Sequence, residues 1–79
     1  MRENAGYEIV TALRVSKRME LVIGRNMKAP SMWVCWYCID GNNYSTGDYC
    51  STFKGALQSL ADRINKNMCF TDFGDLDKE

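Results

Sequence analysis

Cysteine is the residue type with the most specific chemistry in this 79-residue chain, and four cysteines are present. Cys35 and Cys38 form a C-x-x-C pair, a spacing that zinc sites and thioredoxin-like redox sites share. A structural zinc site normally adds a second close pair, but Cys50 and Cys69 are separated by eighteen residues. A zinc-stapled interaction domain is therefore a lesser alternative. We expect these thiols to act as small, buried apolar side chains.

The segment that contains the pair reads SMWVCWYCI and predicts a strand over residues 31–39. Alternation places Met32, Val34, Trp36 and Cys38 on one face, and Trp33, Cys35, Tyr37 and Ile39 on the other. The two thiols of the pair then point to opposite faces, which disfavours zinc binding. A thioredoxin-like site needs its first Cys at a helix N-terminus, and this pair lies within a predicted strand. Both faces are apolar, whereas an antiparallel sheet usually has one polar face.

Catalytic side chains are scarce in this sequence. The chain contains no histidine, which excludes Ser–His and Cys–His pairs. Its Asp and Glu residues fall on predicted turns, strand ends and the C-terminal segment, where nothing makes them converge. A calcium loop that begins at Asp40 would need an acidic twelfth residue, and that position is Ser51. The sequence therefore predicts no enzyme, no cofactor and no metal.

The elements around this strand follow from the hydrophobic period. Alternation predicts three more strands, over residues 7–15, 19–24 and 44–50, of which the last is polar and suits a sheet edge. Asp40 and Gly41 predict a type I′ turn before that last strand. The predicted fold class is α+β: an antiparallel four-stranded meander followed by one C-terminal amphipathic helix, in the order β-β-β-β-α.

The helix is predicted from apolar residues that recur every three or four positions between Phe53 and Met68. Ser51 or Thr52 is the expected N-cap. The predicted solvent side of the helix consists of Lys54, Gln58, Asp62, Arg63 and Lys66.

Charge divides the chain into a single predicted domain, residues 1–68, and an acidic tail, residues 69–79, that is loosely docked or disordered. Residues 1–68 carry nine Lys or Arg against six Asp or Glu, net +3, and residues 69–79 carry one against four, net −3. No apolar leader is visible and the longest apolar run is too short to span a bilayer. We therefore expect a cytoplasmic protein, with thiols that stay reduced.

The width of the predicted sheet raises the question of what covers its rings. Four strands span roughly 19 Å, whereas one helix is about 10–12 Å across. Trp33, Trp36 and Tyr37 then need cover from a second copy or a partner, so we predict a homodimer or partner contact through these residues. The alternative is that the chain's own termini fold over the second face.

A second functional alternative is that the same rings stack the bases of single-stranded nucleic acid. Such a site also needs cations beside the rings. The predicted meander instead places Arg14, Lys17 and Arg18 at one end of the sheet and Arg25 and Lys28 at the other. Direct nucleic-acid binding is therefore less favoured than protein binding.

The stretch GDYCSTFKGALQSLADRI combines a polar strand, a Ser or Thr cap and a helix through Phe53, Ala56, Leu57 and Leu60. This layout, over residues 19–66, resembles small accessory proteins of bacteriophages and prophages, in which a short sheet precedes one helix. Some proteins of that kind, anti-CRISPR proteins among them, inhibit host defence systems.

This resemblance implies a non-enzymatic protein in the cytoplasm of a host cell. It would occupy a surface of a larger host protein or ribonucleoprotein complex, such as a defence nuclease. Four acidic residues could present phosphate-like charges to a basic nucleic-acid channel of such a complex, and a solvated tail is the alternative. These residues are Asp72, Asp75, Asp77 and Glu79.

Overall fold

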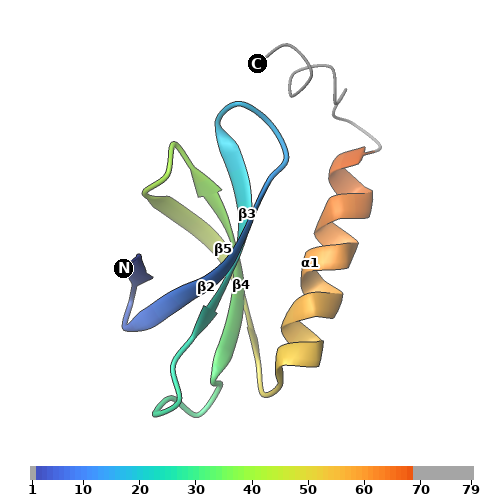
Figure 1. The fold of residues 1–79 in the computed structure, drawn as a ribbon. Helices are drawn as coiled ribbons and strands as arrows, with labels where there is room; N and C mark the ends of the chain where they lie inside the picture. The colour runs from blue at the N-terminus through green and yellow to red at the C-terminus, as the bar shows by residue number, and fades with distance from the viewer. Residues whose placement is uncertain (1, 69–79) are drawn as a thin grey trace.

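Each strand of the sheet pairs antiparallel with its neighbour in sequence in the computed structural model, which describes residues 2–68 (Figure 1). The order is β1-β2-β3-β4-β5, and one helix follows. The α+β meander with a C-terminal helix is thus confirmed. The elements are β1 (Glu3–Asn4), β2 (Tyr7–Arg14), β3 (Met19–Arg25), β4 (Trp33–Ile39), β5 (Asn43–Cys50) and α1 (Phe53–Met68).

The first strand, β1, is an addition to the four predicted strands. It has two polar residues, too few to show any alternation. A tight turn joins it to β2, because Ala5 and Gly6 both have positive φ angles, 52° and 86°. Two positive φ angles are what a type I′ hairpin turn requires. The predicted turn at Asp40 and Gly41 has the same signature, with φ angles of 55° and 81°.

Two predicted features of the chain's second half are confirmed. The polar strand β5 lies at an edge of the sheet. Thr52 caps α1, since its Oγ1 accepts a hydrogen bond of 3.0 Å from the backbone N–H of Gly55. Of the two candidate caps, Thr52 is therefore the one that forms this bond.

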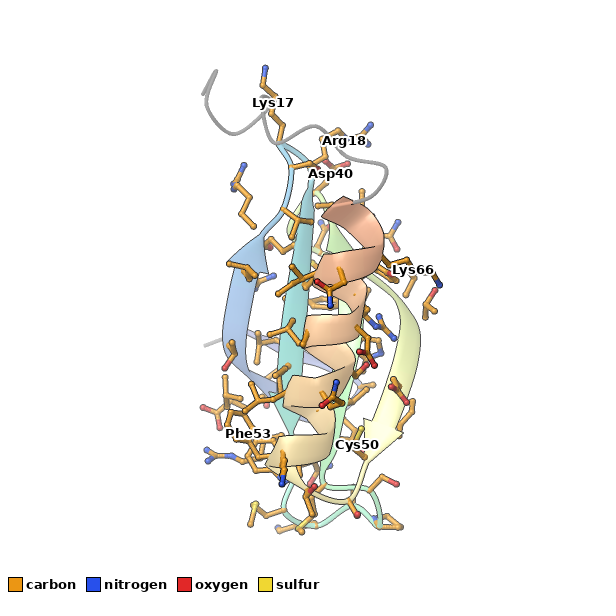
Figure 2. The ribbon with its side chains drawn as sticks, turned by 90° about the vertical axis from the view of Figure 1, so that its right-hand side faces the viewer. Lys17, Arg18, Asp40, Cys50, Phe53 and Lys66 are labelled. Carbon is orange, nitrogen blue, oxygen red and sulfur yellow. The ribbon has the colours of Figure 1, made fainter. Side chains whose placement is uncertain are left out.

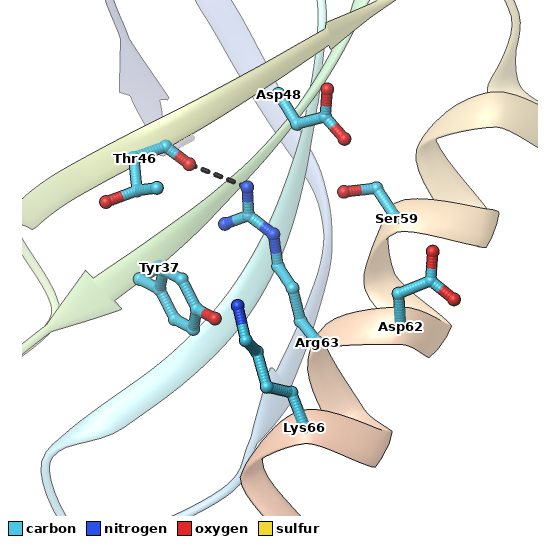
Figure 3. A pocket seen from close by; sticks show the side chains of 7 residues that line it. All are labelled: Tyr37, Thr46, Asp48, Ser59, Asp62, Arg63 and Lys66. Carbon is cyan, nitrogen blue, oxygen red and sulfur yellow. Dashed lines mark hydrogen bonds between the residues drawn. The ribbon is translucent and has the colours of Figure 1, made fainter.

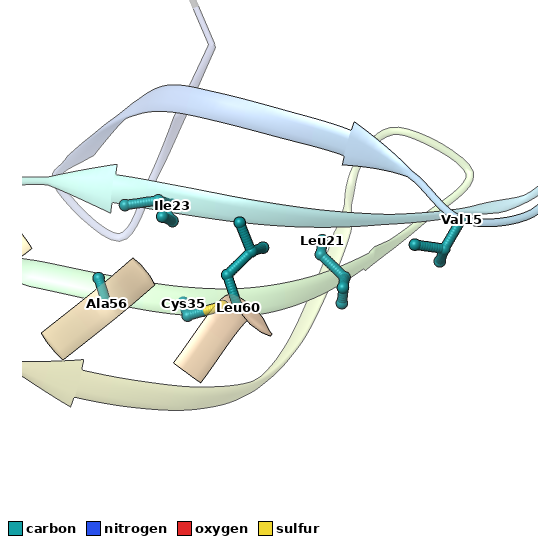
Figure 4. Close-up of a cluster of buried hydrophobic side chains, with 6 residues drawn as sticks. All are labelled: Val15, Leu21, Ile23, Cys35, Ala56 and Leu60. Carbon is teal, nitrogen blue, oxygen red and sulfur yellow. The ribbon is translucent and has the colours of Figure 1, made fainter. Parts of the chain in front are cut away.

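The helix covers one face of the sheet, where it packs mainly on β3, β4 and β5. The core on this side is a cluster of buried residues drawn in Figure 4: Val15, Leu21, Ile23, Cys35, Ala56 and Leu60. Trp33 and Tyr37 pack against this cluster while remaining partly exposed. Trp33, Cys35 and Tyr37 therefore lie on the helix side of the sheet, as alternation predicts.

The opposite face has its own core, made of Tyr7, Val22, Val34, Trp36 and Cys38. The rings of Tyr7 and Tyr49 lie 5.9 Å apart here, although two strands separate β2 from β5 and a flat sheet would hold them roughly 14 Å apart. The sheet is therefore curled. Register shifts near Ile9 and Cys35 mark bulges, which increase twist.

The second face is covered in part by this curl and in part by the N-terminal end, since Arg2 Nη2 lies 3.4 Å from Cys38 Sγ and the Arg2 guanidinium is 5.9 Å from the Tyr44 ring centroid. Trp36 is only 4% exposed, and its ring meets those of Tyr7, Tyr44 and Tyr49 edge-on at 5.6, 5.6 and 6.3 Å. The width argument treats the sheet as flat. The curl instead lets the strands supply part of the cover themselves.

Candidate interaction surface

The three aromatic residues predicted as contact residues do not form one surface. Trp36 lies in the core of the curled face. Trp33 packs against Phe53 of α1, with ring centroids 4.8 Å apart. Tyr37 lies beneath Arg63, whose guanidinium carbon is 4.6 Å from the ring centroid. Each ring therefore already has a partner within the chain, and only Trp33 and Tyr37 retain partial exposure.

Tyr37 and Arg63 belong to a polar cleft between α1 and β5, with a volume of about 260 Å³ (Figure 3). Arg63 crosses this cleft and donates a hydrogen bond of 2.7 Å from Nη2 to the carbonyl oxygen of Thr46. Thr46 has a positive φ of 53° at the bulge in β5. Arg63 therefore ties the helix to the irregular part of the edge strand.

The prediction that Arg63 lies on the solvent side of the helix is wrong. Its side chain is half-buried between the Tyr37 ring and β5, because the long guanidinium arm can pack along a ring while it reaches a carbonyl. Periodicity places the residue correctly around the helix. The neighbouring edge strand β5 covers the side of the helix on which Arg63 lies.

Charges in the cleft balance one another. Arg63 and Lys66 are cationic, while Asp48 and Asp62 are anionic. Asp62 accepts a hydrogen bond of 3.2 Å from Gln58. The cleft therefore offers no net charge to a ligand, and its best-defined contacts hold the fold together.

Two of the three thiols within residues 2–68 are buried, and the third is partly buried. Cys35 and Cys38 belong to the cores of opposite faces, as alternation predicts. Burial raises the pKa of Cys35, and burial also raises the pKa of Cys50, with the carboxylate of Asp48 adding to that rise. A thiol with a raised pKa carries little thiolate at neutral pH and is a weak nucleophile.

Metal ligands do not gather within residues 2–68, where no group of three or more Cys, Asp or Glu side chains could hold an ion. The fourth cysteine of the zinc alternative, Cys69, lies outside the described residues. So do four of the predicted partner contacts: Asp72, Asp75, Asp77 and Glu79.

An apolar strip remains open on the helix side, because α1 lies over β3, β4 and β5 and leaves β2 largely uncovered (Figure 2). We call this strip the β2 flank. It consists of Val10 and Leu13 on β2, 38% and 41% exposed, and Phe53 and Leu57 on α1, 39% and 40% exposed. Sequence reasoning assigns Leu13, Phe53 and Leu57 to buried faces, since periodicity cannot tell where the helix ends its cover.

The positive charge is divided between the two ends of the sheet, as predicted. At one end Arg18 pairs with Asp40 at 2.7 Å, and at the other Arg25 pairs with Glu8 at 3.2 Å. Among residues 2–68 no helix is long and apolar enough to cross a membrane. No family model, curated protein or solved structure matches this chain.

Proposed function

We propose that this chain is a small, non-enzymatic binding protein that acts by occupying a functional surface of a larger partner. The observation that carries this proposal is the β2 flank. Four large apolar side chains, each about two-fifths exposed, lie on β2 and on α1. An exposed apolar patch of the size found on ordinary monomers is often a contact site.

The chemistry of the described residues supports binding over catalysis. The pKa values of Cys35 and Cys50 are raised, which weakens both as nucleophiles. Several charged residues pair with one another, as Arg2 does with Glu20 at 3.1 Å. A domain of this kind can present a shape and an apolar surface, and both suit recognition.

The proposed partner is a host defence nuclease complex that acts on nucleic acid, as the resemblance over residues 19–66 implies. An inhibitor of this type needs only affinity and a position that blocks substrate, so a fixed globule with one apolar contact surface suffices. Host-cell cytoplasm is the proposed location, because such complexes act there.

A homodimer remains part of the proposal, with a limit set by size. The β2 flank exposes on the order of 300 Å² of apolar surface, the scale of the largest patch on an ordinary monomer. A stable interface usually buries about 800 Å² from each partner. Dimerisation through this flank would therefore have to recruit further surface around it, including that of half-buried Trp33.

A pull-down from bacterial host lysate tests the proposal, with Leu13→Gln and Leu57→Gln as a paired variant. We expect the wild-type chain to capture a nuclease complex and to inhibit its cleavage in vitro. The paired variant should lose both effects while keeping its unfolding midpoint within a few degrees.

Met27→Gln is the matched control, because Met27 is 65% exposed and lies in the loop between β3 and β4. It removes exposed apolar surface that is not part of the β2 flank and should keep capture and inhibition. Equal capture by the paired variant and the wild type would refute a contact through this flank.

Single-stranded nucleic-acid binding through the rings gains no support from this arrangement. Trp36 is buried, Trp33 packs on Phe53, and Tyr37 is covered by Arg63. Base stacking needs an open ring face. A labelled oligonucleotide whose mobility shifts at low salt, and no longer shifts with Trp33→Ala, would restore this alternative.

A further inference from the structure

The outer edge of β2 is open along the second half of the strand. β1 pairs with β2 only at Tyr7 and Glu8, and the next bond on this edge runs 2.9 Å from the N–H of Ile9 to the carbonyl oxygen of Arg2. Among residues 2–68, no strand pairs with this edge beyond that point. Figure 2 shows β2 (blue) at the side of the sheet, beside α1 and not behind it. The second half of β2 is therefore a true sheet edge.

The geometry of this edge suits pairing with another strand. Beyond its bulge, β2 keeps a regular register with β3. The N–H of Val15 donates to the carbonyl oxygen of Met19 at 3.0 Å, and the direction of hydrogen bonding alternates along a strand. The main-chain groups of Leu13 therefore point to β3, and those of Ala12 point outward.

The side chains at this edge are apolar and lack most of the features that protect edge strands. Natural edges are usually blocked by Lys, by Pro, by inward-pointing charge or by a bulge. The stretch from Val10 to Leu13 reads VTAL and contains no charge and no Pro, and the bulge in β2 ends before Ala12. Ala12 and Leu13 point to opposite faces, and both are exposed. This part of β2 is therefore open on both faces.

We propose that two copies of this chain pair through these edges, with β2 antiparallel to β2 of the second copy and Leu13 on the two-fold axis. In this register the main chain of Ala12 hydrogen-bonds to the main chain of Arg14 in the second copy, and the reverse. The side chain of Arg14 takes no part and keeps its hydrogen bond of 2.8 Å to the carbonyl oxygen of Lys17. Pairing covers residues 11–15 and stops short of the edge that β1 occupies.

A second copy fits this edge because the edge complements itself. The axis places Leu13 opposite its own copy in a non-hydrogen-bonded pair, where the Cβ atoms lie about 4.5–5.5 Å apart. The two Leu13 side chains, each 41% exposed in the single chain, then cover one another. The axis is perpendicular to the sheet, so both helices lie on the same face and the two β2 flanks join across it.

The area of the flank sets the expected strength of this dimer. One β2 flank exposes on the order of 300 Å², which is less than the surface of about 800 Å² that each partner buries in a stable interface. Main-chain hydrogen bonds along the edge add to the apolar contact, so we expect a weak and reversible dimer. Such a dimer rests on the homodimer part of the proposed function, and it does not require a host nuclease at the flank.

Disulfide cross-linking of the full chain tests the register. In Leu13→Cys the two introduced thiols face each other across Cα atoms about 4.5 Å apart, within the range of a disulfide, so mild oxidation should convert most chains into a covalent dimer. Ala12→Cys is the matched control, because this position is also exposed but lies diagonally about 7–8 Å from its copy, beyond that range. The wild-type chain controls for the four native cysteines.

Ala12→Pro tests the interstrand hydrogen bonds. Proline removes the outward N–H and is tolerated at a sheet edge, while the four side chains of the β2 flank stay in place. Each copy loses one bond worth a factor of about five, so the dissociation constant of the dimer in sedimentation equilibrium should rise about twenty-fivefold. Ala12→Ser keeps the N–H and should dimerise like the wild type.

The outcomes separate this dimer from the host partner. A wild-type chain that is monomeric at every concentration would overturn the edge pair, and so would equal cross-linking of Ala12→Cys and Leu13→Cys or an undiminished dimer in folded Ala12→Pro. If Ala12→Pro does not fold, the cross-linking contrast decides. A monomeric wild type that loses nuclease capture in Ala12→Pro would show that a strand of the partner, and not a second copy, occupies the edge. A dimer that captures no nuclease would refute only the host partner.

Discussion

Replacement of Trp36 by Ala distinguishes a core residue from a contact residue. The ring is 4% exposed and meets three Tyr rings at 5.6 to 6.3 Å. If Trp36 is a core residue, its loss destabilises the isolated chain. If it is a contact residue, its loss weakens assembly and leaves the monomer stable.

The magnitude follows from burial. A Trp side chain that loses about 200 Å² of exposed surface gains roughly 5 kcal/mol at 25 cal/mol per Å². Measured truncations of buried Trp or Phe to Ala cost about 3–5 kcal/mol. The total stability of a chain of this length is about 4–12 kcal/mol. Trp36→Ala should therefore remove a large share of the free energy of unfolding.

The assay is urea unfolding followed by far-UV circular dichroism, at low and high protein concentration. Trp33→Ala is the control, because this ring is half-buried and should cost clearly less. Trp36→Phe keeps a ring in the cluster, so its loss of stability should lie between those of Trp33→Ala and Trp36→Ala. An unchanged midpoint for Trp36→Ala, together with a loss of dimer mass, would refute our assignment of the ring to the monomer core.

Three further results are expected. Gly47→Ala should lower the free energy of unfolding by about 1–3 kcal/mol in the same urea assay, because its Cβ would lie 2.8 Å from Trp36 Nε1; an unchanged midpoint would mean that the ring can move aside. Arg63→Met should cost about 1–2 kcal/mol, through loss of the cation–π contact and the hydrogen bond to the β5 bulge, while Lys66→Met costs less than half of that. The pKa of Cys50 is raised above its ordinary value of 9.0, so alkylation of this residue should be slow at neutral pH and should accelerate above pH 9. Peptide mass spectrometry measures the extent of alkylation. Rapid modification of the folded chain at pH 7 would contradict the burial of this thiol.

The sequence predicts the elements well because its local signals agree with one another. Strand alternation separates Cys35 from Cys38, and the structure places them in different cores. The Asp40–Gly41 turn and the Thr52 cap rest on short-range backbone chemistry, so neither needs tertiary information. Strand β1 is missed because two polar residues carry no period.

The site could not be predicted to the same degree, because it depends on how far the sheet curls. Alternation assigns Trp36 to one face of the sheet but does not show how far the sheet curls. If the sheet is taken as flat, that face is predicted to be open. Likewise, the period of α1 places Leu57 on the apolar side of the helix. It does not show that Leu57 lies past the strands that the helix covers. Both errors arise from long-range geometry.

The same curl accounts for the closed face and for the open flank. Tyr7, at the start of β2, reaches Tyr49 on β5 only if the outer strands bend toward each other on the face away from α1. That bend carries β2 away from the helix, which is about 10–12 Å wide and already lies over the three following strands. Val10 and Leu13 are left about two-fifths exposed as a result. The partner that we propose would therefore meet the β2 flank, and only a chain in which the curl is relaxed would offer Trp36.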